Sequence, residues 1–362
     1  MKTYNFRILV LFFALLTIVD LWAQDVNMDK KVYEKNYIAN SGSYVELSNK
    51  YGDIEVNTWE KDSVSVRVEV KTFSEKWDWR EEMMESIDVD FTCSAGFIVV
   101  ETTWGEGANF WKKSAYKVAK EFGNNRIEVQ YKVSLPKNMP LEIENRFGNV
   151  FIGDYDGQLE VKVHHGDFRA RRLKNLRNLD IRYGKAKIKE VEQAQIDMGS
   201  GSSLDLQHGG ELMITSSSSE IEIETLNSLN INSRHDDIYL ERPSSVNGSF
   251  SLSDLKISDL QKDIKADCKF GSVRIQEVAR NADSVDIDGD KTDIIVGLAS
   301  DFAGRFNIDV DGENDIDYPD EMFIVSSGTD DNKRMKLQGA MGDKEGTIVS
   351  ISSTNGHVKI GD

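Results

Sequence analysis

Apolar and polar residues alternate in one short phrase that recurs along the middle of the chain. The phrase is a small or turn residue, a polar residue and then an apolar–polar–apolar triplet, as in Gly148-Asn149-Val150-Phe151-Ile152. A fixed period this short is typical of a solenoid, in which each repeat forms one coil and neighbouring coils stack. Seven further copies follow at intervals of 17 or 18 residues and begin at Gly166, Gly184, Ser202, Ser219, Asp236, Ser253 and Gly271.

Each phrase is followed by a second alternating run, such as Leu159-Glu160-Val161-Lys162-Val163. Alternation with a period of two predicts strands that bury one face. Two short strands and two tight corners fill a repeat of about 18 residues and leave no room for a helix. We therefore predict an all-β fold, a single-chain parallel β-solenoid with about 17–18 residues per coil. The general rule for parallel connections predicts a right-handed coil.

The ends of the solenoid need covering, because one coil alone buries too little apolar surface to be stable. Residues 44–56 carry the same phrase and are predicted to form the first coil. Residues 74–87 have helical spacing and are predicted to pack across the open end. Residues 103–125 form a long aromatic insertion, in which Lys112 to Phe122 could be an amphipathic helix. That helix is a cap or flap, or alternatively touches a partner or a membrane.

These patterns divide the chain into four parts. Residues 1–23 are a signal peptide, and residues 24–140 hold the first coil with its capping strands, helix and aromatic insertion. Residues 141–291 form the regular β-solenoid. Residues 292–362 hold acidic strands and a closing coil, which repeats the phrase in Thr347–Ile360.

The first 23 residues have the pattern of a secretory signal. Lys2 and Arg7 form a basic start, residues 8–19 are the apolar centre, and Ala23 is a small residue at the expected cleavage position. The apolar run is too short to span a bilayer, and no later segment is long and apolar enough to do so. We therefore expect an exported protein of the periplasm, the outer surface or the extracellular space.

Two features of side-chain placement follow from the same alternation. Cys93 and Cys268 both take inward positions in their runs, which predicts two buried free thiols too far apart for a disulfide.

An aromatic residue also precedes the turn glycine in several coils, as in Tyr51, Phe147, His165, Tyr183 and Phe270. Stacked coils would bring four of these rings onto one edge. There they would form a packing ladder that sets the register or, alternatively, a strip that stacks sugars.

The charge is strongly acidic and unevenly distributed. The net charge of −18 disfavours general nucleic-acid binding. Residues 283–362 nevertheless hold 18 acidic and 7 basic side chains, whereas residues 162–189 hold 10 basic and 2 acidic ones. The acidic end could dock on the basic region of another copy, which would give salt-sensitive self-association.

The basic region is the best candidate site. Arg169 and Arg171 alternate with inward residues and face outward, and Lys187 and Lys189 lie one coil further along the same face. Like charges about 5 Å apart repel by roughly 0.8 kcal/mol even in water, which favours a bound anion. The predicted ligand is an anionic envelope polysaccharide or a lipid head group. The alternative is a solvated face offset by neighbouring carboxylates. The candidate residues are Arg169, Arg171, Arg172, Lys185, Lys187 and Lys189.

Other chemistry has little support. The acidic segments 286–290 and 309–313 lack the glycine positions of an EF-hand or a calcium-binding roll. Residues 199–203 lack the spacing of a nucleophile elbow, and the five histidines show no metal-ligand spacing. We therefore predict no catalytic residue, metal site or cofactor.

Several motifs resemble a known family. The segment Asn49–Ile54, the strand ending in Leu135-Pro136 and the closing Thr354–Val358 are similar to secreted bacterial β-repeat proteins described as adhesins or domains of unknown function. The resemblance covers nearly the whole mature chain, apart from the long insertion at 103–125. It implies a β-repeat fold and a non-enzymatic, adhesin-like binding or scaffold role. The alternative is a polysaccharide-degrading β-helix enzyme, which would need a cleft with converging carboxylates.

Overall fold

The computed structural model describes residues 27–40, 42–105, 126–311, 316–330, 334–342 and 346–361. The predicted signal peptide and the predicted helix at Lys112 to Phe122 lie outside these residues. The chain forms two compact units. One holds Val70–Ile87 with residues 27–31, 104–105 and 126–127, and the other holds Val32–Glu69, Asp88–Thr103 and the described residues from Glu128 onward.

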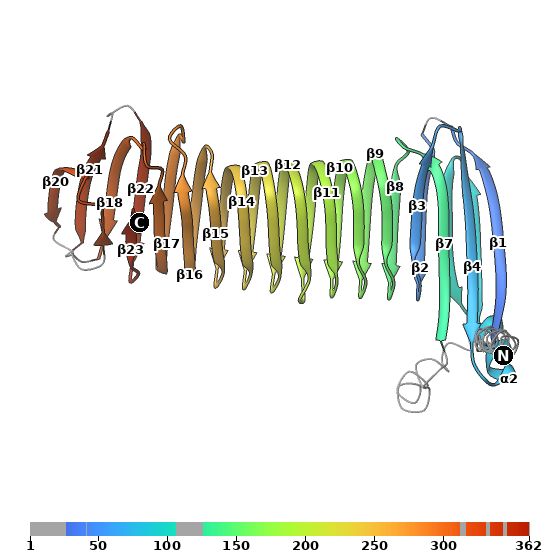
Figure 1. The fold of residues 1–362 in the computed structure, drawn as a ribbon. Coiled ribbons are helices and arrows are strands. Elements are labelled where there is room, and N and C mark those ends of the chain that lie inside the picture. Colours follow the sequence, from blue (N-terminus) through green and yellow to red (C-terminus); the bar gives the residue numbers. More distant parts are fainter. Residues whose placement is uncertain are drawn as a thin grey trace, which may run out of the picture. The chain divides into compact units, whose positions relative to one another are not determined.

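The larger unit is a stack of parallel coils, and Figure 1 shows β9 to β16 side by side in sequence order. It confirms the predicted parallel β-solenoid, which has about nine turns. The handedness remains a prediction. The coils are formed by β8 (Leu141–Arg146), β9 (Val150–His164), β10 (Phe168–Arg182), β11 (Lys185–Gly199), β12 (Ser203–Ser217), β13 (Glu220–Arg234), β14 (Asp237–Ser251), β15 (Asp254–Leu260), β16 (Asp263–Val278) and β17 (Ser284–Leu298).

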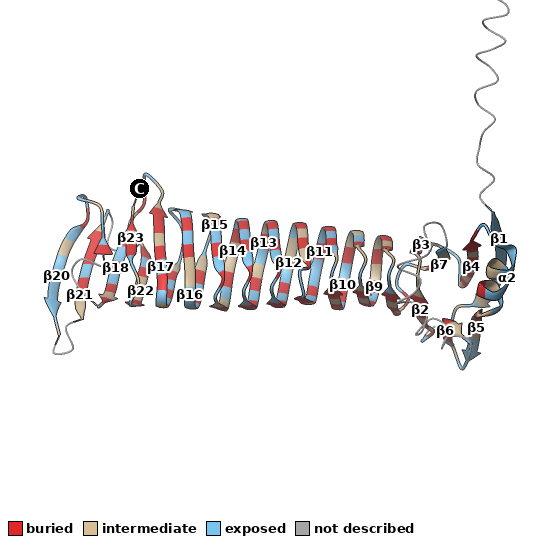
Figure 2. Cartoon of the chain, turned by 90° about the horizontal axis from the view of Figure 1, so that it is seen from below, coloured by how far each residue is buried: buried red, intermediate tan, exposed pale blue. Residues whose placement is uncertain are grey.

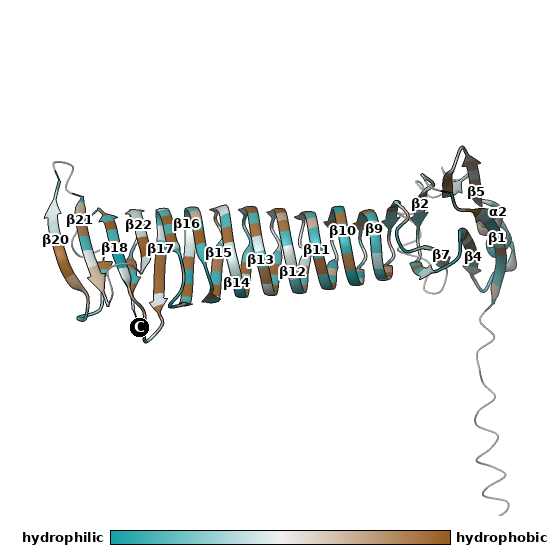
Figure 3. Ribbon diagram, turned by 90° about the horizontal axis from the view of Figure 1, so that it is seen from above, coloured by the Kyte–Doolittle hydropathy of each residue, from teal (hydrophilic) through white to brown (hydrophobic). Residues whose placement is uncertain are grey.

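Alternation of apolar and polar residues produces the core of each coil. In β10, the buried residues are Phe168, Leu173, Leu176, Leu179 and Ile181, and polar side chains between them point outward. Figure 2 shows the resulting bands of buried and exposed residues, and Figure 3 shows matching apolar and polar bands. Most coils contain one 15-residue strand rather than the two separate short strands predicted, because the ladder continues through one corner.

Residues 44–56 form a coil of the stack, as predicted, although they lie far from the neighbouring coil in sequence. The strand β2 (Tyr44–Lys50) pairs with β8, and β3 (Ile54–Trp59) pairs with β9 in the same parallel register as the later coils. It is not the outermost layer, because β6 (Phe97–Trp104) and β7 (Arg126–Pro136) pair with its other side. The remaining N-terminal strands are β1 (Met28–Ile38), β4 (Ser63–Phe73) and β5 (Ile87–Ser94).

The C-terminal strands do not follow sequence order. The closing phrase forms β22 (Thr347–Thr354) and β23 (Val358–Ile360), which pair directly with β17. Strands β18 (Gly304–Val310) and β19 (Ile316–Asp317) then pair with the other side of β22 and β23. The antiparallel strands β21 (Met335–Met341) and β20 (Phe323–Thr329) extend the sheet beyond β18.

One corner of the solenoid carries a ladder of aromatic rings. Tyr51, Phe147, His165 and Tyr183 stack with ring centroids 5.2, 4.9 and 4.5 Å apart and nearly parallel planes. All four residues have φ between 56° and 66°, the left-handed conformation that turns the chain sharply. The predicted packing ladder is therefore confirmed. The rings cover one another's faces, and among the described residues no further ring stacks on the last one, Tyr183.

The predicted helix is present as α2 (Trp77–Glu85), in the smaller unit. Met83 is its buried residue, and Trp77 is exposed. Its predicted position across the end of the solenoid stays a prediction.

The prediction of two buried thiols is half right. Cys268 is buried, and burial raises the pKa of its thiol to about 12. Cys93 is exposed, contrary to the prediction. It lies at the end of β5, where the chain turns through Ala95 and Gly96 into β6, so its inward parity no longer places it over a core.

Candidate functional site

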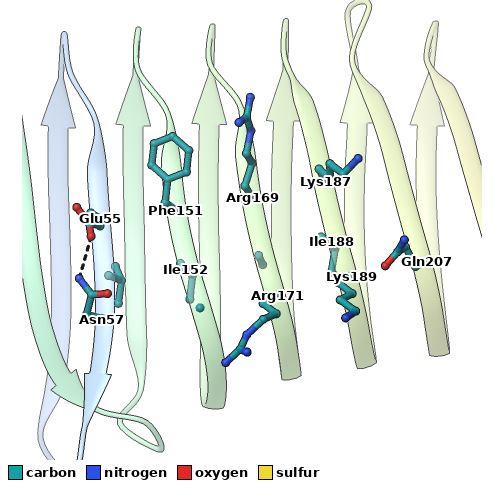
Figure 4. Close-up of a pocket in the computed structure, with 13 residues that line it drawn as sticks. Glu55, Asn57, Phe151, Ile152, Arg169, Arg171, Lys187, Ile188, Lys189 and Gln207 are labelled. Atoms are coloured by element: carbon teal, nitrogen blue, oxygen red, sulfur yellow. Dashed lines mark hydrogen bonds between the residues drawn. The ribbon is translucent and has the colours of Figure 1, made fainter.

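Stacking brings the predicted basic residues together on one outer face. Arg169 on β10 lies directly opposite Lys187 on β11, as the period of 18 residues predicts. Arg171 and Lys189 follow two positions later on the same strands. Figure 4 shows these four side chains on neighbouring coils, around an open depression of about 500 Å³.

The rest of the lining explains why the face is hollow there. Gly153 on β9 occupies the position next to Arg171, and a side chain at Gly153 would meet open space. The ring of Phe151 forms one wall, with the Arg169 guanidinium 5.8 Å from its centroid. Such a cation–π contact holds a guanidinium over an aromatic face and limits its freedom. The further lining residues are Glu55, Val56, Asn57, Ile152, Ala170, Ile188 and Gln207.

Carboxylates on neighbouring coils offset much of this positive charge. Arg169 pairs with Asp167 at 3.1 Å, and Arg171 pairs with Asp154 at 2.5 Å. Lys187 lies 3.1 Å from Asp205. These pairs are exposed, and exposed pairs add little to stability, so their side chains can be redirected to a ligand at small cost.

Lys189 differs from its three neighbours. No carboxylate of the described residues lies within ion-pair distance of its amine. It is therefore the cation of the depression that a bound anion could neutralise without breaking an existing pair.

The two remaining candidates, Arg172 and Lys185, do not line the depression. Arg172 pairs with Asp156 at 2.8 Å and reaches Glu192 at 4.0 Å, whereas Lys185 lies 3.2 Å from Asp205. The sequence predicted both as part of the site only because they are close in sequence to the other four candidates. In the structure, both face carboxylates at the edge of the depression.

The carboxylate shared by two lysines shows the local electrostatics. Burial by itself raises the pKa of Asp205, but hydrogen bonds from Lys187 and Lys185 outweigh burial and hold the pKa below its usual value. A depressed pKa means that the ionised form stabilises the folded state above the pKa of the unfolded chain. This contribution is lost as pH falls through the lower, folded-state pKa.

A second depression of about 400 Å³ lies along another face of β10 to β13, and its lining includes one basic and one acidic residue, Arg177 and Glu211. Its lining is rich in side-chain amides and includes the exposed side chain of Met213. Sequence reasoning missed it because most of its polar residues are uncharged and belong to no motif. The amide residues are Asn175, Gln193, Gln195 and Asn230.

The acidic segments do not form a metal centre in the part of the chain that the structure describes, which contains no group of three or more potential metal ligands. Asp286 and Asp288 alternate along the straight strand β17 and point outward. Asp309 and Asp311 both accept hydrogen bonds from the Arg334 guanidinium, at 2.6 and 2.7 Å.

Comparisons with known proteins give similarity in fold only. No protein-family model matches the chain, and no curated protein matches it. A search for membrane spans among the described residues finds no helix that is long and apolar enough.

Several solved structures are similar to the chain. One, described as a "putative adhesin" from Bacteroides fragilis, is 12% identical, covers 75% of this chain and 98% of its own, and has a TM-score of 0.34. A "putative lipid binding protein" from Parabacteroides distasonis is 14% identical over 75% and 93%, with a TM-score of 0.31. A "putative cell adhesion protein" from Clostridium sporogenes is 11% identical over 91% and 99%, with a TM-score of 0.17.

Proteins described as adhesins are thus among its structural neighbours, as the sequence resemblance predicted.

Proposed function

We propose that the protein is an exported, non-enzymatic binding or scaffold module with an adhesin-like role, and that the basic depression binds an anionic envelope polysaccharide. The observation that carries this proposal is the alignment of Arg169, Arg171, Lys187 and Lys189 around one open hollow. They lie together in a chain with a net charge of −18, so the basic face stands out from the rest of the surface.

The form of the site favours binding over hydrolysis. Glycoside hydrolysis generally uses two carboxyl groups on either side of the scissile bond. The lining of the depression includes one carboxylate, Glu55, and four cations. An open, ladder-like face can instead contact several successive units of a polymer, because equivalent side chains return at each coil.

Charge reversal within the depression tests the proposal. We expect the Arg169→Glu/Lys187→Glu variant to bind an acidic envelope polysaccharide about tenfold more weakly or worse, because charge-assisted contacts are lost and repulsion is added. Lys256→Glu/Arg274→Glu is a matched control, since these residues lie in the same outward column further along and the net charge changes equally. Binding is measured by calorimetry at two salt concentrations.

The same proteins are then mixed with phosphatidylglycerol vesicles. Equal polysaccharide binding by the parent and the depression variant would contradict the proposal. A loss confined to the vesicles would show that the depression recognises lipid head groups instead of a polysaccharide.

A further inference from the structure

The aromatic ladder ends at Tyr183, and its last ring has a free face. His165 covers one face of this ring at a centroid distance of 4.5 Å. The next residue in the same corner column is Ser200, which has no ring to cover the other face. The side chain of Tyr183 is accordingly 56% exposed.

The guanidinium of the preceding residue, Arg182, leans toward the next coil. Arg182 pairs across the coils with Gly199, and its Nη1 lies 2.9 Å from the position that a Cβ of Gly199 would take. The guanidinium therefore covers Gly199 and points toward the next coil, the side to which the free face of Tyr183 is turned. An ion pair with Asp180, at 3.2 Å, anchors it.

The same pair of groups returns three coils later. Arg234 occupies the column of Arg182, through Gly199 and Ser217, and His235 occupies the corner column of Tyr183. Arg234 and His235 are both exposed. Among the described residues, no carboxylate forms an ion pair with the Arg234 guanidinium.

The corner between the two pairs carries hydroxyl groups. Ser200 and Ser218 occupy the two intervening corner positions, with the same left-handed backbone conformation as the aromatic residues, and both are exposed. With a coil spacing of roughly 4.8 Å, the rings of Tyr183 and His235 are roughly 14 Å apart. A single ion cannot contact both arginines over this distance, whereas a short oligosaccharide can.

We propose that this edge is a binding site for an acidic glycan, a saccharide that carries carboxylate or sulfate groups. The free face of Tyr183 stacks on the apolar C–H face of one sugar, and the His235 ring stacks on another. Arg182 and Arg234 bind the acidic groups, since the planar guanidinium matches a carboxylate or sulfate with two parallel hydrogen bonds. The hydroxyls of Ser200 and Ser218 exchange hydrogen bonds with the sugar hydroxyls between them.

This site goes beyond the proposed function, because it lies on a corner of the solenoid and shares no residue with the basic depression. It also assigns a role to the part of the ladder that packing leaves unexplained. A purely structural ladder has no need of a guanidinium beside its open end, or of a second arginine and ring at the same columns.

The test measures binding of trigalacturonate, an unsulfated hyaluronan tetrasaccharide and a chondroitin sulfate tetrasaccharide to the full chain. We expect at least one of them to bind, and galactotriose, which is neutral, to bind far more weakly. Arg234→Ala and Tyr183→Ala should each weaken acidic-glycan binding about tenfold, the effect of losing one charged or stacked contact. Arg242→Ala, an exposed arginine that pairs with Asp259, is the matched control and should bind like the parent.

The depression variant Arg169→Glu/Lys187→Glu separates the two proposals. Retained oligosaccharide binding in this variant, with loss in Arg234→Ala, supports the corner site. Loss in the depression variant alone would overturn the corner site and leave the proposed function intact. Failure of all three acidic oligosaccharides to bind the parent would also overturn it, and thermal unfolding checks that each variant is folded.

Discussion

Close packing at the corners decides which residues the chain can use there. A Cβ at Gly148, Gly166 or Gly184 would lie 1.8–1.9 Å from the carbonyl oxygen of the glycine one coil earlier. The backbones touch at these three corners, so these positions require glycine for space, whereas Ser202, Ser219, Asp236 and Ser253 occupy the equivalent position in later coils. The residue before each of these glycines adopts the left-handed conformation and carries the aromatic ring. The glycine therefore provides the space for the close approach, and the residue before it provides the turn.

The corner glycines give a prediction at the residue scale. Gly166→Ala should lower the free energy of unfolding by roughly 2–3 kcal/mol, since either the added methyl or the neighbouring coil must shift. Gly153→Ala is the matched control, because no atom lies within 4 Å of the added methyl group. Urea denaturation followed by circular dichroism measures both. A loss of similar size in the two variants would show that the corners are not closely packed.

A buried polar cluster around Asp236 connects neighbouring coils in the middle of the solenoid. Asp236 is 2% exposed and accepts hydrogen bonds from the hydroxyls of Ser216 and Ser233 at 2.5 and 2.6 Å. It also accepts bonds from the backbone N–H groups of Ser219 and Arg234, at 2.8 and 3.0 Å. Four donors satisfy this carboxylate, so its burial is compatible with a stable core.

A deletion of one whole coil tests the repeat as the structural unit. Glu220 pairs with Asp237, so removal of residues 220–236 joins Ser219 to Asp237 in an unchanged register and removes Asp236 with its coil. We expect this variant to fold with a parallel β spectrum and a modestly lower Tm, because each coil contacts only its neighbours. Removal of residues 220–227, about half a coil, should abolish folding, because the corners of the later coils would no longer lie over those of the earlier coils. Similar behaviour of the two deletions would contradict stacking by coil.

Surface charge and exposed sheet edges determine how the larger unit can associate with other copies of the chain. Part of the predicted acidic docking surface is already neutralised within the chain, because Arg334 binds Asp309 and Asp311. The outer strand β20 pairs only with β21 among the described strands. It exposes Phe323 and Val325, and an uncharged edge of this kind can pair with another chain.

Sedimentation at low and high salt distinguishes these two routes of self-association. If the acidic end docks on the basic region, association should weaken markedly at high salt, because screening reduces contacts between exposed charges. If β20 pairs edge to edge, association should survive salt and disappear in Val325→Lys, which places a charge on the edge strand. A monomer under all conditions would rule out both.

Much of the fold could be predicted because the repeat is strictly periodic. Alternation with a period of two decides which side chains face inward, and the 17- to 18-residue interval decides which residues share a column. These two periods together predict the parallel coils and the stacked rings. They also predict that Arg169 lies opposite Lys187. The prediction that Cys93 is buried was wrong. An inward position in a strand buries a side chain only where a core lies beneath it, and the strand runs past the core at Cys93.

The sequence alone therefore determined the solenoid, its register and the gathering of basic residues on one face, since all three depend on local periodicity. Only the tertiary structure decided which carboxylates neutralise them, because long side chains reach between coils in directions that no spacing specifies. Only the tertiary structure placed β22 between β17 and β18, and β23 between β17 and β19, because strands order themselves by the edges available to them, not by their position in the chain.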